Sequence, residues 1–231
     1  MGRRSKKRPF RATSRGLQTG RGPIDFAVQK IFLLSPAHSG GKRAQLILNP
    51  RAGFPLARRL HLGESVALGE IFTFLSGLYF RGKLTYAQTF ASPPPGLAGA
   101  YVITSNRGLL PADCPIALAE LKAFSTVDID AADLRYRRPL LRAAKLIAKK
   151  HPECRVVLLG SISTGKYVDV LLDVFDERLQ FPSEFVGRGD MSRGGLMLRC
   201  VRGAPELKYV AVAGAIRRGK RPPKLQPVGA A

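Results

Sequence analysis

At 231 residues the chain is long enough to bury one substantial hydrophobic core, and we expect a single domain. Apolar residues make up 45% of it, but 38 Lys and Arg against 16 Asp and Glu leave a formal net charge of +22. No apolar run reaches the roughly 18 residues that a membrane helix needs, and the first residues lack the apolar stretch of a signal peptide. The composition therefore argues against a membrane protein and favours a cytoplasmic one.

The positive charge is concentrated towards the two ends of the chain. Residues 1–24 hold eight Lys and Arg, residues 213–231 hold five, and neither segment contains an acid. Both segments are rich in Gly and Pro and poor in large apolar side chains, so we expect disordered basic arms on either side of a domain at residues 25–212. Such arms bind phosphate backbones by releasing counterions, although an excess of Arg can also serve only solubility.

The cysteines and histidines predict neither a disulfide framework nor a metal centre. The three cysteines are odd in number, widely spaced and without a Cys-x-x-Cys pair, and the three histidines lack a ligand spacing. We predict no metal and no cofactor. The residues are Cys114, Cys154, Cys200, His38, His61 and His151.

In chain order, the first predicted strand is Lys30–Leu34, a short apolar run that ends at Ser35-Pro36. Residues 62–80 are mostly apolar and long enough for a helix, which Gly77 should break. A second helical piece runs from about residue 83 to residue 90, and Tyr101–Thr104 then predicts a buried strand.

The second half of the chain continues this alternation. Residues 138–150 have the apolar periodicity of a helix, and residues 155–160 form the strongest strand signal of the chain. Residues 168–175 can continue as a helix, and two closing strands at 196–201 and 207–212 predict a hairpin. Alternating strands and helices predict an α/β fold, a single three-layer domain with a mainly parallel central sheet.

Four basic residues recur at helical spacing within the predicted helix at 138–150. Arg138, Arg142, Lys145 and Lys149 stand at i, i+4, i+7 and i+11, and no acid interrupts them. The stripe predicts a nucleic-acid-binding face, although an outward charged face is also what an ordinary surface helix carries.

A glycine-rich segment after the strand at 155–160 matches most of a phosphate-binding loop. Gly160 to Lys166 reads G-x-x-x-x-G-K, in which backbone N–H groups wrap a phosphate and the lysine reaches its oxygens. Tyr167 stands where a magnesium-binding Ser or Thr belongs, so the segment fits an anion cradle without hydrolysis, or an ordinary turn, better than a nucleoside triphosphatase. The candidate phosphate- or nucleotide-binding residues are Gly160, Ser161, Thr164, Gly165, Lys166 and Tyr167.

Two further segments combine flexible backbone with charge. Residues 185–195 contain four glycines with Arg188 and Arg193, whose guanidinium groups can grip an anion, and Asp190, which either pairs with them or acts as a catalytic acid. After the strand at 101–104, Asn106-Arg107-Gly108 forms a polar turn, followed by Asp113 as a second candidate catalytic acid.

These turns follow predicted parallel strands, and ligands of open α/β sheets bind beyond the carboxyl ends of such strands. We therefore expect the loop at 35–42, the turn at 106–108 and the segment at 160–166 to converge on one site.

Three segments resemble a loose group of bacterial α/β domains that are similar to nucleobase-modifying and glycosylase-like folds. They are the strand and serine loop at Phe32–Ser39, the strand and turn at Tyr101–Leu110, and the strand and Gly-Lys-Tyr turn at Val156–Tyr167. The resemblance covers about residues 28–175 and implies nucleobase or nucleotide chemistry. No catalytic acid stands at a matching position, and the 185–195 segment lies outside it.

Three functions fit these patterns. The first is a basic nucleic-acid-binding protein that contacts phosphates through its arms, the basic helix face and the glycine-rich loops. The alternative is an enzyme on a nucleotide or nucleobase, of glycosyl-transfer or hydrolysis type, with Lys166, Arg107 and Arg188 on the phosphate and Asp113 or Asp190 as acid or base. The third is an anchor in which the arms hold the domain to a ribonucleoprotein or another acidic partner.

Overall fold

A six-stranded sheet lies at the centre of a computed structural model, which describes residues 1–2 and 28–225. The strand order is β4-β3-β1-β6-β7-β8; β1, β3, β6 and β7 are parallel, and β4 and β8 run antiparallel at the two edges. The strands are β1 Lys30–Leu34, β3 Ala100–Ile103, β4 Leu109–Pro111, β6 Arg155–Leu159, β7 Leu179–Pro182 and β8 Tyr209–Ala211. A separate two-stranded sheet joins β2, Val66–Ala67, to β5, Pro115–Ile116.

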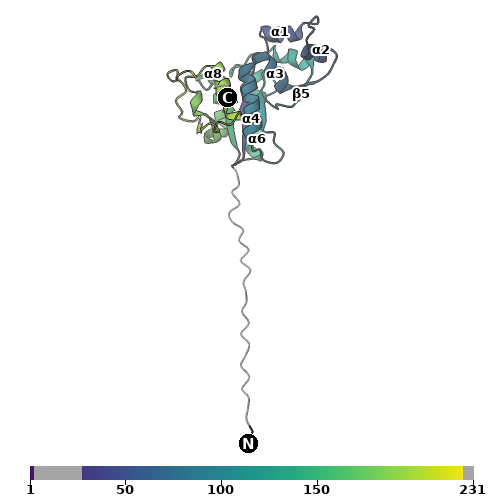
Figure 1. The fold of residues 1–231 in the computed structure, drawn as a ribbon. Coiled ribbons are helices and arrows are strands. Elements are labelled where there is room, and N and C mark those ends of the chain that lie inside the picture. The colour runs from purple at the N-terminus through teal and green to yellow at the C-terminus, as the bar shows by residue number, and fades with distance from the viewer. Residues whose placement is uncertain (3–27, 226–231) are drawn as a thin grey trace.

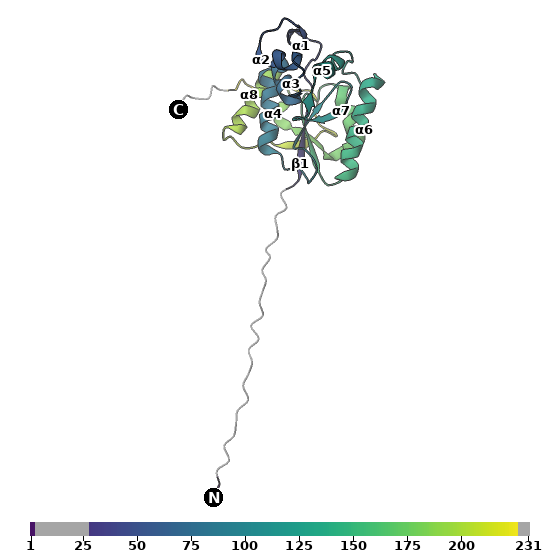
Figure 2. The same cartoon turned by 90° about the vertical axis from the view of Figure 1, so that its right-hand side faces the viewer.

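Helices cover both faces of the large sheet, so the domain has three layers (Figures 1 and 2). Helices α6, Leu134–Lys150, and α7, Gly165–Phe175, pack together on one face. Helices α3, Leu68–Ser76, α4, Leu78–Phe90, and α8, Asp190–Val201, lie on the other. Shorter helices gather at the end of the sheet where β1 finishes: α1 Lys42–Leu48, α2 Pro55–His61 and α5 Leu118–Phe124. The predicted α/β domain with a mainly parallel sheet is confirmed.

Strand β1 shows why apolar runs form the centre of this fold. Successive side chains of a strand point to opposite faces. Phe32 and Leu34 enter the core beneath α3, α4 and α8, whereas Ile31 and Leu33 enter the core beneath α6 and α7. All four are fully buried, so after Lys30 the strand is apolar at consecutive positions rather than at alternate ones.

Local signals set the helix boundaries that differ from the prediction. Helix α6 begins at Leu134, four residues before the predicted start, because the Asp133 side chain accepts a hydrogen bond from the backbone N–H of Arg135. The predicted break at Gly77 is present, with φ at 63°, and it separates α3 from α4. The prediction that the helix begins at residue 62 is wrong, because the strand β2 precedes α3 there.

The predicted closing hairpin is wrong. Residues 196–201 form the second half of α8, and only Tyr209–Ala211 forms a strand, which pairs with β7. The 185–195 segment is likewise not one loop, because α8 begins at Asp190 and includes Gly194. Gly194, Met197 and Cys200 are buried at spacings of three residues, which is a helical periodicity with a glycine in place of one apolar side chain.

The predicted arms are described only in part. Of residues 1–24, all but the first two lie outside the described residues, as do residues 226–231 of the C-terminal segment. Residues 213–225 contain neither helix nor strand, yet they contact the domain. Arg217 pairs with Asp169 at 3.0 Å, and the Pro223 carbonyl accepts a hydrogen bond from Arg188 at 3.3 Å.

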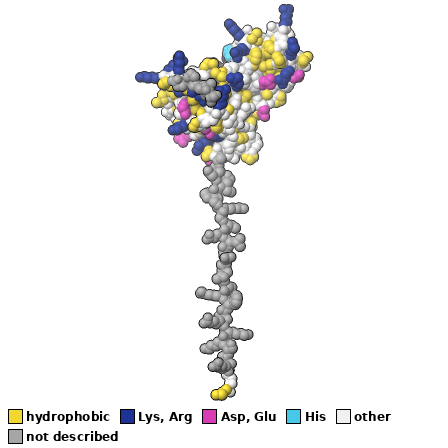
Figure 3. Space-filling model, in the orientation of Figure 1, with side chains coloured by type: hydrophobic (Ala, Val, Ile, Leu, Met, Phe, Trp, Pro, Cys, Tyr) yellow, Lys and Arg dark blue, Asp and Glu magenta, His cyan; other side chains and the backbone are white. Residues whose placement is uncertain are grey.

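Lys and Arg side chains project into solvent from the end of the domain that carries α1 and α2 and from the α8 side (Figure 3). Within the described ranges, no helix is both long and apolar enough to cross a membrane.

Candidate functional site

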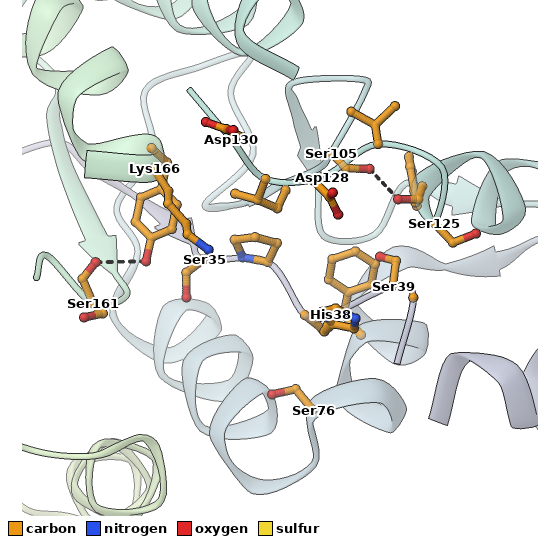
Figure 4. A pocket seen from close by; sticks show the side chains of 18 of the residues that line it. Ser35, His38, Ser39, Ser76, Ser105, Ser125, Asp128, Asp130, Ser161 and Lys166 are labelled. Atoms are coloured by element: carbon orange, nitrogen blue, oxygen red, sulfur yellow. Dashed lines mark hydrogen bonds between the residues drawn. The ribbon is translucent and has the colours of Figure 1, made fainter. Parts of the chain in front are cut away.

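A cavity of about 800 Å³ opens at the end of the sheet where the parallel strands finish. Its walls come from the loop 35–40 after β1, from Ser105 after β3 and from Ser161 after β6 (Figure 4). The loop 127–130 that precedes α6 closes another side. Of the three segments predicted to converge, the loop 35–42 and the segment 160–166 contribute lining residues, whereas the turn 106–108 does not and β3 contributes Ser105 instead.

The order of the strands explains why the cavity forms here. The chain leaves β1 and returns as its neighbour β3 through α4 on one face, and it then reaches β6, the neighbour on the other side, through α6 on the opposite face. Connections that diverge to opposite faces leave a crevice beyond the strand ends, where open α/β sheets bind ligands.

Ser35, the first residue after β1, contacts a buried lysine. Lys83 of α4 donates hydrogen bonds to the Ser35 carbonyl oxygen at 2.6 Å and to its Oγ at 2.9 Å. Lys83 is only 1% exposed, and its amino group lies 4.4 Å from the ring centre of Tyr79 and 4.8 Å from that of Phe80. Burial, which disfavours the charged form, lowers the pKa of Lys83 to about 7; the Asp190 carboxylate opposes this shift and Arg193 adds to it.

Gly160 allows the ends of β1 and β6 to meet. A Cβ atom at this position would lie 2.7 Å from the Ser35 Cβ and 3.0 Å from the Tyr167 hydroxyl oxygen. The Tyr167 hydroxyl donates a hydrogen bond to the Ser161 carbonyl at 2.9 Å, shown dashed in Figure 4. Gly160 thus brings the hydroxyl groups of Ser35 and Tyr167 together at the cavity wall.

The predicted phosphate-binding residues divide into two groups. Ser161, Lys166 and Tyr167 line the cavity, and Figure 4 shows the Lys166 amino group directed into it on the side of Ser35. The other three, Gly160, Thr164 and Gly165, are not among its lining residues. The Asp169 carboxylate folds back over Gly165 and pairs with Arg217, so one of the chain's own acids lies at the start of α7.

Only one of the two predicted acids lies at the cavity. Asp190 lines it from the start of α8, with its side chain 66% exposed and 3.5 Å from Arg193. Asp113 is exposed in the turn between β4 and β5 and does not line it. Asp128 and Asp130, which the sequence reasoning missed, line it from the loop before α6. Their only sequence signal was a position just ahead of a predicted helix.

An aromatic wall completes the cavity. Phe72 and Phe124 meet edge to face with ring centres 6.3 Å apart, and Tyr79 lines the same cavity. Tyr79 is 6% exposed. Burial raises the pKa of Tyr79, and the nearby Arg193 guanidinium opposes this shift.

The three predicted anion-binding arginines bind groups of the protein itself. Arg193 is buried and donates to the Phe185 carbonyl through Nε at 3.2 Å and Nη2 at 3.1 Å. Arg188 donates to the Glu184 carbonyl at 3.0 Å, and Arg107 pairs with Glu120. None of the three arginines lines the cavity.

The predicted basic stripe is exposed on α6. Arg138, Arg142, Lys145 and Lys149 all face solvent, while Tyr136, Leu140, Ala144 and Ile147 of the same helix are buried. Within residues 28–225, none of the four cations forms an ion pair with a carboxylate.

Together these features define an open α/β domain with a cavity at the carboxyl edge of its sheet. In the described part of the chain, no group of three or more His, Cys, Asp or Glu residues is arranged to hold a metal ion. Comparisons with protein-family models, with curated proteins and with solved structures found no significant match to this chain.

Proposed function

We propose that the cavity binds a nucleoside or nucleotide. The observation that carries the proposal is the lining of the cavity of about 800 Å³ beyond the ends of β1, β3 and β6, where the Lys166 amino group shares one space with aromatic rings and carboxylates. A space of this size that offers a cation, apolar rings and hydrogen-bond acceptors suits a small polar molecule.

The lining groups match the parts of a nucleotide. The rings of Phe72, Tyr79 and Phe124 offer an apolar surface for a base. Asp128, Asp130 and Asp190 offer acceptors for sugar hydroxyls and base amino groups. Lys166, whose amino group points into the cavity on the side of Ser35, supplies a cation for a phosphate.

Thermal unfolding with added nucleosides and nucleoside monophosphates tests this proposal. A nucleotide present at about 100 times its Kd is expected to stabilise the protein by about 2.7 kcal/mol, seen as a rise in Tm. Lys166→Ala should weaken binding of the monophosphate by about tenfold or more and leave binding of the nucleoside unchanged, because only the phosphate meets the lysine.

Lys122→Ala is the matched control, since Lys122 is exposed on the neighbouring α5 and does not line the cavity. This control should respond to both ligands as the wild type does. A protein whose Tm responds to no nucleoside or nucleotide contradicts the proposal.

The exposed stripe of α6 favours a second function, the binding of a nucleic acid. Its four cations face solvent without a carboxylate partner in the described residues, so they are available for phosphates. The cavity residues Asp128 and Asp130 lie just before α6 in the chain. A strand held along α6 would therefore run close to the cavity opening.

Fluorescence anisotropy with labelled DNA and RNA measures this second function. The wild type should bind the labelled nucleic acid at 50 mM salt, and its affinity should fall steeply when the salt is raised to 200 mM. On duplex DNA, the double variant Arg142→Ala with Lys145→Ala should have a slope of log K against log salt concentration that is less steep by about 1.8, because two phosphate contacts are lost.

The matched double variant, Lys122→Ala with Arg202→Ala, removes two exposed cations away from the stripe and should keep the wild-type dependence. If both double variants lost the same amount of salt dependence, the binding would depend on net charge alone, and α6 would not be the binding site.

A further inference from the structure

We propose that Ser35 and Lys83 form a catalytic pair that hydrolyses a carboxylic ester bound in the cavity, with Ser35 as the nucleophile and Lys83 as its general base. The proposal rests on the contact between the Ser35 Oγ and the Lys83 amino group, 2.9 Å apart at the cavity wall. It does not depend on a nucleotide as the ligand.

The surroundings of Lys83 suit a base better than a structural cation. A lysine buried as a charge normally has a carboxylate partner that offsets the lost hydration. In the described residues Lys83 forms no ion pair, and it lies among the rings of Tyr79 and Phe80. The same burial lowers the pKa of Lys83 to about 7, so its amine is largely neutral in mildly basic solution.

The hydrogen bonds place the lysine for proton transfer. Lys83 donates at 2.6 Å to the Ser35 carbonyl oxygen, which is fixed by the backbone. A neutral amine can keep this bond and turn its lone pair towards the Ser35 Oγ at 2.9 Å. Pro36 restricts Ser35 to extended backbone, which holds the hydroxyl at the strand end.

The charge beside Ser35 suits attack on a carbonyl group. An ester carbonyl is neutral until it is attacked. Lys166, directed into the cavity on the Ser35 side, then faces the negative charge that develops on the carbonyl oxygen.

The reaction balances without a further reagent. The Ser35 Oγ bonds to the carbonyl carbon while its proton passes to the Lys83 amine. The bond from carbon to the alcohol oxygen breaks, and the Lys83 ammonium gives its proton to the leaving alkoxide. Water then attacks the acyl-serine and loses a proton to Lys83, and the carboxylic acid leaves as the Ser35 oxygen takes that proton back.

A fluorophosphonate with a fluorescent tag tests the pair without knowledge of the substrate. The Ser35 Oγ should bond to phosphorus and release fluoride, while Lys83 takes the serine proton. We expect the full chain to gain one adduct in intact mass at pH 8, located at Ser35 by peptide mapping. Ser35→Ala should abolish the adduct. Ser92→Ala, at the opposite end of β1 beside Lys30, should label as the wild type does.

Two further measurements separate a base from a structural lysine. Lys83→Met keeps an unbranched apolar side chain and should fold. We expect its labelling rate to be lower than that of the wild type by a factor of about 100 or more. The labelling rate of the wild type should rise with pH to a plateau, with a midpoint near 7, as Lys83 loses its proton. Tyr79, Asp190 and Arg193 also face Lys83, Tyr167 lies beside Ser35, and His38 lines the same cavity. His38→Ala should therefore keep the pH profile of the wild type.

An adduct on another residue, no adduct in the wild type, an unchanged rate in a folded Lys83→Met, or a rate independent of pH would each overturn the proposal. Nucleotide binding is read by Tm and not by labelling. Failure of the ester proposal therefore leaves the nucleotide proposal to its own test.

Discussion

Replacing Gly194 by valine is expected to destabilise the domain by about 3 kcal/mol or more, because α4 and α8 meet backbone to backbone at this residue. A Cβ at Gly194 would lie 3.0 Å from the Tyr79 Cα and 3.1 Å from the Leu78 carbonyl oxygen. Gly82 of α4 meets Gly194 in the same way, with its own Cβ position 2.9 Å from the Gly194 carbonyl oxygen. Backbone atoms cannot turn aside as a side chain can, so the helices must separate.

Urea denaturation of the wild type and of Gly194→Val measures the loss. Gly195→Ala is the matched control in the same helix, because a Cβ there meets only the Leu225 Cδ1, at 3.5 Å. The control should be neutral or stabilising by up to about 1 kcal/mol, since alanine favours a helix. Equal stabilities of the two variants would show that the close approach of the helices is not needed. Separated helices would also move Tyr79 and Lys83 of α4 away from the cavity wall.

The second large effect is a dependence of stability on pH that Lys83 alone causes. Burial holds the pKa of Lys83 at about 7 in the folded protein, against 10.5 for an ordinary lysine. Below pH 7 the residue is protonated in both states, and the folded state carries the full cost of a buried charge. Above pH 7 the folded state releases this proton while the unfolded state keeps it, so the free energy of unfolding rises with pH.

The rise is expected to approach about 1.4 kcal/mol per pH unit between pH 8 and 9.5. It is measured as the difference between the wild type and Lys83→Met in urea denaturation from pH 6 to pH 9.5. Burial also raises the pKa of Tyr79, Tyr167, Cys154 and Cys200. These residues are present in both proteins, so their contributions to the pH dependence cancel in the difference. A constant difference across this range would show that Lys83 does not lose its proton there.

The Ser35 loop illustrates how far the candidate site was predictable. Its position after a buried parallel strand indicated a ligand loop, and the structure places it at the cavity. Lys83 carried no such signal, because it is 48 residues away in sequence from its partner. A lysine on a helix normally faces solvent, and its burial depends on how α4 lies over β1.

The three predicted anion-binding arginines lie outside the cavity lining and bond to groups of the protein itself. The sequence around Arg107, Arg188 and Arg193 is glycine-rich or polar, which is where a bound anion is expected. Each instead binds a group of the protein that comes close only in the fold, such as the Phe185 carbonyl at Arg193. The glycines of this region likewise serve packing, since Gly194 allows the contact with α4.

Residue pattern alone determined the features that depend on neighbours in the chain. The apolar run at β1 forms a buried strand, Gly77 ends a helix, and the basic stripe of α6 faces solvent, because backbone preference and periodicity act over a few residues. Tertiary structure alone decided which residues share the cavity. Ser35 contacts Lys83 and shares the cavity with Asp128 because the crossovers from β1 and β3 pass over opposite faces of the sheet, and only the order of the strands sets that path.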